Sequence, residues 1–322
     1  MAPQQKTIVQ EFGQCVLGYV PPFGPVWDSI WTRGNELILL QLKVVMRADT
    51  THKLGLILKQ EEKMAYQALT VNVTEEGIGQ IALNRPEQLN VFNTTMAAEL
   101  GQALTEMEAD PQVRVIVLKG TGKVFSAGID VTEFWDKSPS HYKAWVELME
   151  KSLQIMMSIG KPVIAQVHGV AAANGAGLVA ASDLAVCSED ARIGFTAINV
   201  GLFCLGPAVP LSRVLGRKQA LELLLFGDLI PAHRAMEMGL VNKVVPANEL
   251  VAETLAYARK LAAKSPQALQ MGKKTFHVTL DMELNKAFEY MNEAFARLCS
   301  FRDAHEGVSA FLEKREPQWR GE

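Results

Sequence analysis

Two stretches of small residues follow apolar segments, and each could expose backbone N–H groups to a ligand. "KVFSAGID" (123–130) comes after "VRVIVLKG", and "HGVAAANGAGLVAASD" (168–183) comes after "KPVIAQV". Glycine and alanine let the backbone approach a ligand closely, and free N–H groups can hold negative charge. The part from Val170 to Asp183 contains no Glu, His or Lys. The pattern therefore predicts an anion site that lacks a proton carrier of its own.

Such a pair of loops suits a thioester carbonyl. Loops at the ends of neighbouring strands can each turn one N–H toward the same point. Enolate and tetrahedral intermediates place negative charge on the carbonyl oxygen, and losing one fixed donor costs roughly 3–4 kcal/mol in the transition state. The alternative is that both loops are tight turns against a helix, since glycine is common in turns. Either loop alone is compatible with both interpretations.

Composition limits the classes of protein that fit. A chain of 322 residues with 48% hydrophobic and 21% charged residues is typical of a soluble globular protein with a substantial core. A net charge of −3 argues against nucleic acid or an anionic membrane as the main partner. The four cysteines show no metal-ligand spacing, so we expect reduced thiols and no metal site. For Cys204, burial in the core is favoured over a chemical role.

The first 63 residues differ from the rest. They mix prolines, glycines and aromatic residues without a period, and could be an accessory arm, a partly disordered segment, or sequence upstream of a start at Met64. No apolar run reaches the ~20 residues needed to span a bilayer, and the pattern of a secretory signal is missing. Glu11, Asp28 and Glu36 are atypical of a transit peptide. We therefore expect a cytoplasmic protein, with an organelle matrix as the alternative in a eukaryote.

After Met64 the pattern alternates between strands and helices. "LTVNV" and "IGQIALN" flank Glu75-Glu76-Gly77 and predict a hairpin. "VRVIVLKG", "KPVIAQVHG" and "LAVCS" predict buried strands of a mainly parallel sheet in an α/β fold. "NTTMAAELGQALTEMEAD" predicts a helix with Asn93 or Thr94 as its N-cap. Its expected buried face consists of Met96, Leu100, Ala103, Leu104 and Met107.

The sequence after "LVNKVVP" predicts helices to the end of the chain. "ANELVAETLAYARKLAAKS" and "MELNKAFEYMNEAFARLCS" are long and amphipathic, and could pack on their own core or on a neighbour. In "DAHEGVSAFLEKR", Asp303 and Glu306 have the spacing of a capping box. We predict an N-terminal extension (1–66), a core (67–258) and a C-terminal helical region (259–322).

Six segments in register resemble the crotonase (enoyl-CoA hydratase/isomerase) family, over about Leu69 to Gly321. They are "LNRPEQLN", "FSAGIDV", "VHGVAAANGAGLVAASDLAV", "NVGLFCLGPAVPLSRVLG", "AMEMGLVNKVV" and "EGVSAFLEKREPQW". The resemblance implies a spiral of ββα units with a C-terminal helical trimerisation region. It also implies an acyl-CoA substrate, a role in fatty acid metabolism, and a homotrimer or hexamer. No separate cofactor is expected, because coenzyme A is carried as part of the substrate.

The resemblance assigns the two oxyanion donors to the amides of Ile129 and Asn174. Lys123, and also Arg85, could meet the phosphates of CoA, or could be solvated surface cations. Lys314 and Arg315 could complete the CoA site of a neighbour, or could lie on an exposed helix face. The residues expected to bind substrate are Leu89, Val91, Lys123, Ala127, Gly128, Asp130, Ala172 and Gly175.

The sequence departs from the family where its carboxylates are expected. The positions of the two hydratase glutamates fall on Gly177 and Asn199, and a further carboxylate position used by some isomerases and dehalogenases falls on Pro207. Asparagine can hold water or a carbonyl by hydrogen bonds but cannot take a proton, so Asn199 is predicted to contact the acyl group. The resemblance therefore predicts a wider pocket and an atypical enoyl-CoA, such as a cyclic or conjugated thioester. The alternative is a non-catalytic acyl-CoA-binding or regulatory subunit.

Three other polar residues have two interpretations each. Asp130 could be catalytic, or could cap the following helix. Glu133 could reach the mouth of the pocket, or could be a surface charge. His168 could act as an acid or base, or could be a structural imidazole bonded to the backbone.

Overall fold

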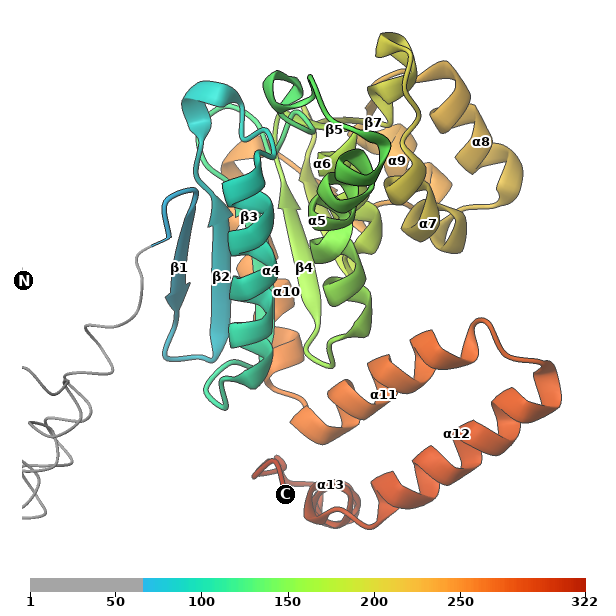
Figure 1. Cartoon of the computed structure of the whole chain (residues 1–322). Coiled ribbons are helices and arrows are strands. Elements are labelled where there is room, and N and C mark those ends of the chain that lie inside the picture. The colour runs from blue at the N-terminus through green and yellow to red at the C-terminus, as the bar shows by residue number, and fades with distance from the viewer. Residues whose placement is uncertain (1–65) are drawn as a thin grey trace, which may run out of the picture. The chain divides into compact units, whose positions relative to one another are not determined.

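The computed structural model describes residues 66–322, and Tyr66–Glu322 forms one compact unit. The predicted N-terminal extension lies outside the described residues except for its last position. The main sheet has six strands in the order β1-β2-β3-β4-β6-β9 (Figure 1). These strands are β1 (Leu69–Val73), β2 (Ile78–Leu83), β3 (Val115–Gly120), β4 (Val163–Val167), β6 (Leu184–Ser188) and β9 (Lys243–Val245).

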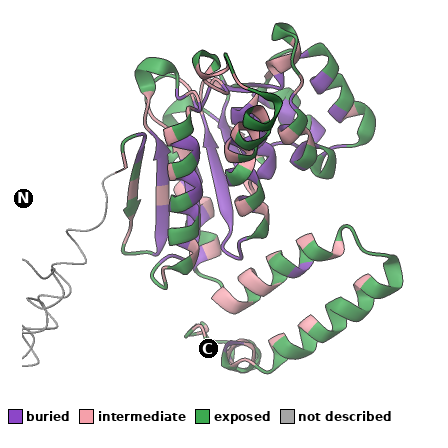
Figure 2. Ribbon diagram, viewed as in Figure 1, coloured by how far each residue is buried: buried purple, intermediate pink, exposed green. Residues whose placement is uncertain are grey.

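The pairing follows the predicted pattern. β1 and β2 form the expected antiparallel hairpin, and every later pair in this sheet is parallel. The central strands are buried along nearly their whole length (Figure 2), as expected for parallel strands covered on both faces. Ile78 and Val115 face α10 (Leu250–Ala262), whereas Ile81 and Ile116 face the larger core on the other side. The predicted α/β class is confirmed.

A smaller sheet consists of β5 (Val170–Ala172), β7 (Arg192–Gly194) and β8 (Ile230–Pro231). Only His168 and Gly169 separate β4 from β5. Gly169 has φ +59°, and a Cβ there would overlap the backbone of Lys123. A glycine is therefore needed where the chain turns from the large sheet into the small one.

The helices of the core cover the sheet, and the first of them buries the apolar face that the sequence predicts. All five residues expected on the inner face of the first helix, α4 (Thr94–Ala109), are buried, and the side chain of Asn93 caps it by accepting from Met96 N. Cys204 is 5% exposed, which confirms its predicted burial. The other helices before the C-terminal region are α5 (Pro139–Ser158), α6 (Asn174–Ala181), α7 (Leu205–Val214), α8 (Arg217–Phe226) and α9 (Ala232–Met238).

The C-terminal region is helical, as predicted. The predicted boundary at 258/259 falls inside α10, and the helices after α10 are α11 (Pro266–Thr279), α12 (Leu284–Cys299) and α13 (Arg302–Glu313), which extend beyond the sheet (Figure 1). In this single chain α12 has no buried residue. Within residues 66–322, no helix combines the length and the apolar character needed to cross a membrane.

The predicted capping box at Asp303 is wrong. The helix α13 begins at Arg302, and its N-cap, Phe301, makes no side-chain capping bond. Asp303 lies in the first turn, 2% exposed, where its carboxylate accepts hydrogen bonds from Ser265 Oγ (2.8 Å) and Arg320 N (2.8 Å). Glu306 instead pairs with Arg315. Both carboxylates are bonded to residues nine or more positions away and not to the backbone at the start of the helix. The local spacing was therefore misleading.

One largely buried ion pair links α11 to the core. The Asp183 carboxylate accepts from Val163 N (2.7 Å) and lies 2.7 Å from Lys273 Nζ, which also donates to the carbonyl of Met156. The two side chains are 18% and 8% exposed. This pair holds α11 at the start of β4.

We predict that Lys273→Met lowers the free energy of unfolding by about 3 kcal/mol, because the largely buried Asp183 carboxylate loses its lysine and keeps only His277 (3.6 Å) as a possible ionic partner. The neighbouring Lys274 pairs with Glu108 at 51% exposure, so Lys274→Met is the control and costs under about 1 kcal/mol. Urea unfolding at neutral pH measures both variants. Equal losses for the two lysines would contradict the assignment.

Candidate active site

The segment 84–93 holds the first donor loop in place through Asn90. After the short helix η2 (Pro86–Gln88), Leu89 and Asn90 both have positive φ (51° and 52°). The Asn90 side chain is fully buried; its Nδ2 donates to Thr121 O (2.8 Å) and Val124 O (2.9 Å), and its Oδ1 accepts from Arg85 N (2.9 Å). Asparagine tolerates the left-handed region and supplies these bonds at once. One side chain thus positions the start of "VFSAGID".

The first donor is the N–H of Ile129. Phe92 N donates to Gly128 O (2.7 Å) and Asp130 N donates to Phe92 O (2.8 Å), which makes a parallel bridge between Phe92 and Ile129. In such a bridge the N–H of the central residue points to the opposite side. Among the described residues, Ile129 N has no acceptor. Its N–H is therefore available to a ligand.

The second donor is the N–H of Asn174, the first residue of α6. Ala173 precedes it with φ 48° and ψ −111°, a conformation that costs a non-glycine residue roughly 1–3 kcal/mol. The Ala173 N–H donates to Gly194 O (2.8 Å). The first N–H groups of a helix have no acceptor within it, and that of Asn174 has none in the described part of the chain. The helix dipole adds partial positive charge at this end.

The two donor loops are bonded to each other. Ser126 N donates to Val170 O (3.1 Å), and Ala172 N donates to Ser126 O (2.9 Å). A Cβ on Gly175 would lie 2.6 Å from Ser126 O, and one on Gly128 would lie 3.0 Å from the Ala173 Cβ. The loops that the sequence placed far apart are thus in direct contact. That both N–H groups meet one thioester oxygen stays a prediction.

Most of the predicted substrate-binding residues lie in these bonded loops. Leu89 is exposed at its side chain, while its carbonyl accepts from Ala127 N (3.0 Å). Lys123 is exposed at the start of the first loop, with its side chain in solvent. The remaining members of the predicted set that lie in or beside the loops are Val91, Gly128, Asp130, Ala172 and Gly175.

Two charged residues beside the donor loops, Asp130 and Arg85, have structural partners. Asp130 caps η3 (Val131–Glu133) and forms an ion pair with Arg85 (3.2 Å). Burial raises the pKa of Asp130, but hydrogen bonds from Thr132 and Arg85 and the Arg85 charge outweigh it, so the pKa lies below its ordinary value. Arg85 also donates to Val91 O (2.7 Å) and is therefore held against the protein.

Two further candidates have structural roles. Glu133 accepts from Thr94 N (2.9 Å) and Thr94 Oγ1 (2.7 Å), so it bonds to the first turn of α4. His168 bonds through Nε2 to the carbonyl of Gly122 (3.0 Å), which confirms the interpretation as a backbone-bonded imidazole. Both side chains thus make structural hydrogen bonds.

The predicted widening at the missing glutamates is wrong at Gly177. A Cβ there would lie 2.9 Å from both Cβ and Cγ of Pro207, so the proline of α7 fills the space that a side chain would use. Asn199 lies in η4 (Thr196–Val200), exposed, and its Nδ2 donates to Gly227 O (3.0 Å). Two of the three carboxylate positions assigned by resemblance, Gly177 and Pro207, are therefore in contact.

Two residues that position the loops were not identified from the sequence. In the sequence, Asn90 is an asparagine shortly after a proline-containing turn, and nothing there indicates that it holds a loop. Ser126 is fully buried, and its Oγ donates to Asn90 O (2.8 Å). Its partners lie in a different segment, so the sequence contained no local signal for it.

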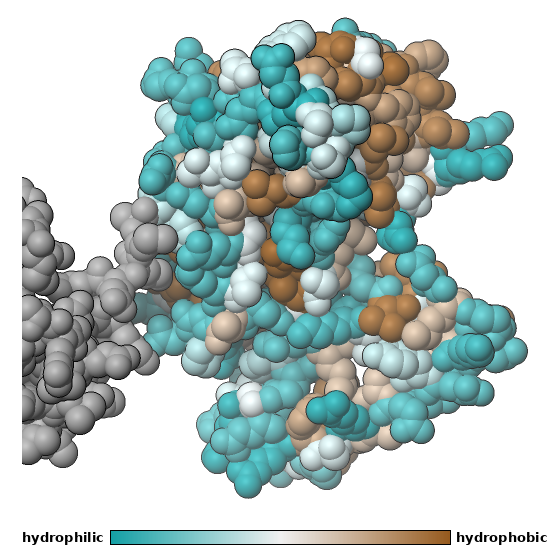
Figure 3. Space-filling view, in the orientation of Figure 1, coloured by the Kyte–Doolittle hydropathy of each residue, from teal (hydrophilic) through white to brown (hydrophobic). Residues whose placement is uncertain are grey.

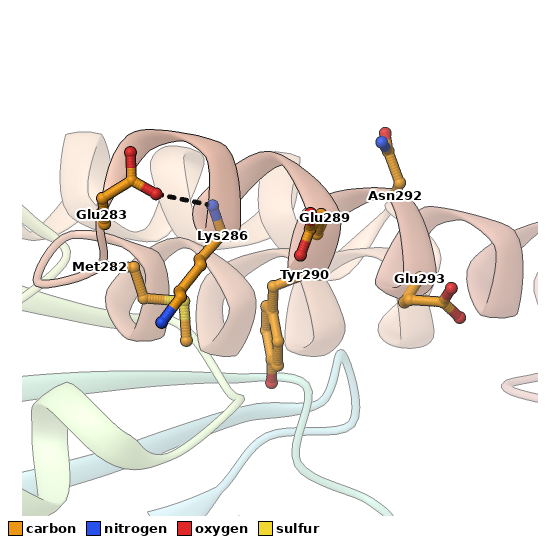
Figure 4. A pocket seen from close by; sticks show the side chains of 7 residues that line it. All are labelled: Met282, Glu283, Lys286, Glu289, Tyr290, Asn292 and Glu293. Atoms are coloured by element: carbon orange, nitrogen blue, oxygen red, sulfur yellow. Dashed lines mark hydrogen bonds between the residues drawn. The ribbon is translucent and has the colours of Figure 1, made fainter.

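A separate hollow lies on α12. Its volume is about 790 Å³, and its lining residues belong to α12 and the turn before it. Met282, Lys286 and Tyr290 extend to the same side of the helix, whereas Asn292 points to the opposite side (Figure 4). It is a helix surface remote from the donor loops, and it brings no catalytic group to them.

Known proteins share this arrangement of sheet, spiral and C-terminal helices. The fold matches a crystal structure of enoyl-CoA hydratase from Mycobacterium smegmatis with a TM-score of 0.76 and 40% identity, covering 78% of this chain and 98% of that one. It also matches human enoyl coenzyme A hydratase domain-containing protein 3 with a TM-score of 0.75 and 36% identity, covering 79% and 100%. The fold is the crotonase fold.

The sequence comparisons agree. The family model described as enoyl-CoA hydratase/isomerase matches residues 73–322. The human protein named enoyl-CoA hydratase domain-containing protein 3, mitochondrial, is 38% identical over 250 residues, or 77% of this chain and 82% of that protein. A putative enoyl-CoA hydratase of Thermus thermophilus is 37% identical over 255 residues, or 77% and 100%. The chain belongs to the enoyl-CoA hydratase/isomerase family.

We predict that Gly177→Ala lowers the free energy of unfolding by about 1–2 kcal/mol, since the new methyl group must displace Pro207. The control is Gly101→Ala in α4, where a Cβ would make only ordinary contact with Ile155 (3.6 Å). Because alanine favours a helix, the control gains up to about 1 kcal/mol. Urea unfolding measures both. Stabilisation by both substitutions would contradict the close packing of Gly177 on Pro207.

Proposed function

We propose that the chain binds an acyl-CoA thioester and stabilises its enolate in an oxyanion hole made by the N–H groups of Ile129 and Asn174. The observation that carries this proposal is that neither N–H group has an acceptor in the described part of the chain, while their loops are bonded together through Ser126. Fixed donors in a partly water-excluded site stabilise developing charge without reorganisation. Coenzyme A enters as part of the substrate, and we propose no further cofactor.

The proposed substrate is an atypical enoyl-CoA, such as a conjugated or cyclic thioester. Hydration of an ordinary straight-chain enoyl-CoA needs groups that position and activate water, and the resemblance places these at Gly177 and Asn199. Neither residue can take a proton. Because Pro207 fills the space beside Gly177, the argument rests on proton chemistry and not on a larger pocket. The reaction is then a lyase or isomerase step in fatty acid metabolism.

A second candidate function is a non-catalytic acyl-CoA-binding or regulatory subunit. It is favoured by the absence of a carboxylate at Gly177, Asn199 and Pro207. A panel of enoyl-CoAs distinguishes the two: an enzyme turns over at least one, whereas a binding subunit binds CoA esters and turns over none.

We propose a homotrimer or hexamer, assembled in part by the C-terminal helices. Large apolar side chains are exposed on these helices in the single chain, among them Phe276 (56%), Phe288 (63%), Phe295 (67%) and Phe311 (82%). A second apolar area covers α7 and α8 (Figure 3), with Leu205 72% exposed. Apolar surface on this scale is typical of an interface. The vertebrate relatives are named as mitochondrial, and a cytoplasmic or matrix location for this chain stays a prediction.

We predict that cinnamoyl-CoA absorbs at longer wavelength when bound to the wild-type protein, because donors at the carbonyl oxygen polarise the conjugated chain. In Gly128→Ala the new Cβ meets Ala173 at 3.0 Å and φ is +107°, so the donor loops shift and the red shift is largely lost. Absorption difference spectra measure it.

Gly239→Ala is the matched control for this experiment. Gly239 also has positive φ (+91°), but nothing lies within 4 Å of its Cβ position. It shares the backbone strain and leaves the donor loops intact, so it keeps the red shift. A wild-type protein that binds cinnamoyl-CoA with no red shift would refute the proposed oxyanion hole.

A further inference from the structure

The carboxylate of Glu150 has no ionic partner within residues 66–322 that would explain its position. Glu150 lies in the middle of α5 and reaches the first turn of α7, where a Cβ on Gly206 would overlap its carboxyl group. The Gly206 backbone does not have positive φ, so the glycine is not needed for backbone conformation, and its missing side chain leaves the space that the Glu150 carboxyl group occupies. Within residues 66–322, no Lys, Arg or His forms an ion pair with Glu150.

This carboxylate lies against the residue next to Pro207, one of the positions where a family carboxylate is missing. Gly206 is followed by Pro207, which contacts Gly177, and consecutive Cα atoms are only about 3.8 Å apart. The three helices that bring these residues together, α5, α6 and α7, pack against one another (Figure 1). Glu150 therefore brings a carboxylate from a third helix to the residue beside Pro207, whereas Gly177 and Pro207 themselves supply no carboxylate.

The same helix is tied to the second donor. Asn174 Nδ2 donates to the carbonyl of Met149 (3.1 Å), the residue before Glu150. Asn174 is 1% exposed, and its Oδ1 is buried with no hydrogen-bond partner among the described residues. A buried acceptor without a partner is expensive unless a ligand or water supplies a donor. Asn174 thus links the donor N–H, an unused acceptor and the backbone that carries Glu150.

We propose that Glu150 is the catalytic residue that moves the proton during enolate formation in this protein. The proposal rests on the proposed function, because the enolate must be held by the N–H groups of Ile129 and Asn174. Glu150 supplies the carboxylate that is missing at Gly177, Asn199 and Pro207.

The step is a proton transfer that balances without a further reactant. A Glu150 carboxylate oxygen takes a proton from the α carbon, and the electrons of the broken C–H bond form the bond between the α carbon and the carbonyl carbon. The carbonyl electron pair moves onto the oxygen, where the two N–H groups hold the charge. Return of the proton from neutral Glu150, to the same carbon or to a conjugated one, completes exchange or isomerisation.

The surroundings of Glu150 suit this role. Burial raises the pKa of Glu150, the hydrogen bond from Gly206 N–H lowers it, and the charge of Glu147 raises it, so that it lies above its ordinary value. A carboxylate with a raised pKa is a stronger base in its ionised form. The side chain is only half-buried, so protons can exchange with water.

A purely structural role is the competing explanation. The N-cap residue of α7, Cys204, makes no side-chain capping bond, so Glu150 could serve only as an acceptor for the N–H of Gly206. Glutamine keeps a carbonyl oxygen in the same place and can also accept that bond. The substitution Glu150→Gln therefore separates capping from proton transfer.

The experiment measures exchange of the α protons of phenylacetyl-CoA in D₂O by mass spectrometry, using the full-length chain. Glu150→Gln is expected to slow exchange by about 10²-fold or more, the usual contribution of a general base. Glu222→Gln in α8 is the matched control, because Glu222 is exposed and is not among the groups that shift the pKa of Glu150. This control keeps wild-type exchange. Thermal unfolding confirms that both variants fold.

Gly206→Ala tests the position of the carboxylate without removing it. Alanine suits a helix, but its methyl group must push the Glu150 carboxyl aside. Exchange is expected to fall about tenfold or more while the fold is kept, because misplacing a catalytic group by ~1 Å is costly. In the wild type, exchange falls as the pH drops through the raised pKa of Glu150, and this inflection disappears in Glu150→Gln.

The cinnamoyl-CoA spectrum separates the two proposals. Glu150→Gln that keeps the red shift and loses exchange supports both. A wild-type red shift with no exchange, or with exchange unchanged in Glu150→Gln, overturns the role of Glu150 and leaves the oxyanion hole standing. A wild-type protein that binds cinnamoyl-CoA without a red shift overturns the oxyanion hole and the role of Glu150 with it.

Discussion

The bonds between Ser126 and the segment 170–172 are the constraint on which the site depends. They join the loop after β3 to β5, the short strand that follows β4, and the N–H groups of Ile129 and Asn174 on either side have no acceptor within residues 66–322. Parallel pairing of β3 and β4 puts both loops at one edge of the sheet, because parallel strands end on the same side. Without these bonds, the two free N–H groups would belong to two unrelated turns.

The strain in the site is local and is offset by the surrounding fold. Ala173 holds a conformation that a non-glycine residue rarely adopts, and its N–H is bonded to Gly194 of the small sheet. Gly128 and Gly175 allow the loops to touch at distances that no side chain permits. Asn90 holds the other side of the first loop with buried hydrogen bonds. Backbone and small residues form the site, so its electrostatics come from N–H groups and a helix dipole.

Prediction from the sequence succeeded where the pattern is local. The hairpin of β1 and β2, the buried face of α4 and its cap at Asn93 follow from alternation, from the helical period and from capping preference. Prediction failed at Asp303, whose spacing matched a capping box but whose carboxylate bonds to Ser265 and Arg320. It failed again at Gly177, because the loss of a side chain suggests empty space unless Pro207 is known to fill it.

The sequence by itself determined the order of strands and helices, the α/β class, and the two glycine-containing loops at which backbone donors could be exposed. These properties depend on residues a few positions apart, whose apolar period and backbone preferences can be read directly. Only the tertiary structure decided that Ser126 bonds to Val170, that Pro207 covers Gly177 and that Glu150 reaches Gly206. Each of these contacts joins residues that are 30 or more positions apart, or lie on different helices, and no short-range pattern encodes which of many buried or polar residues will meet.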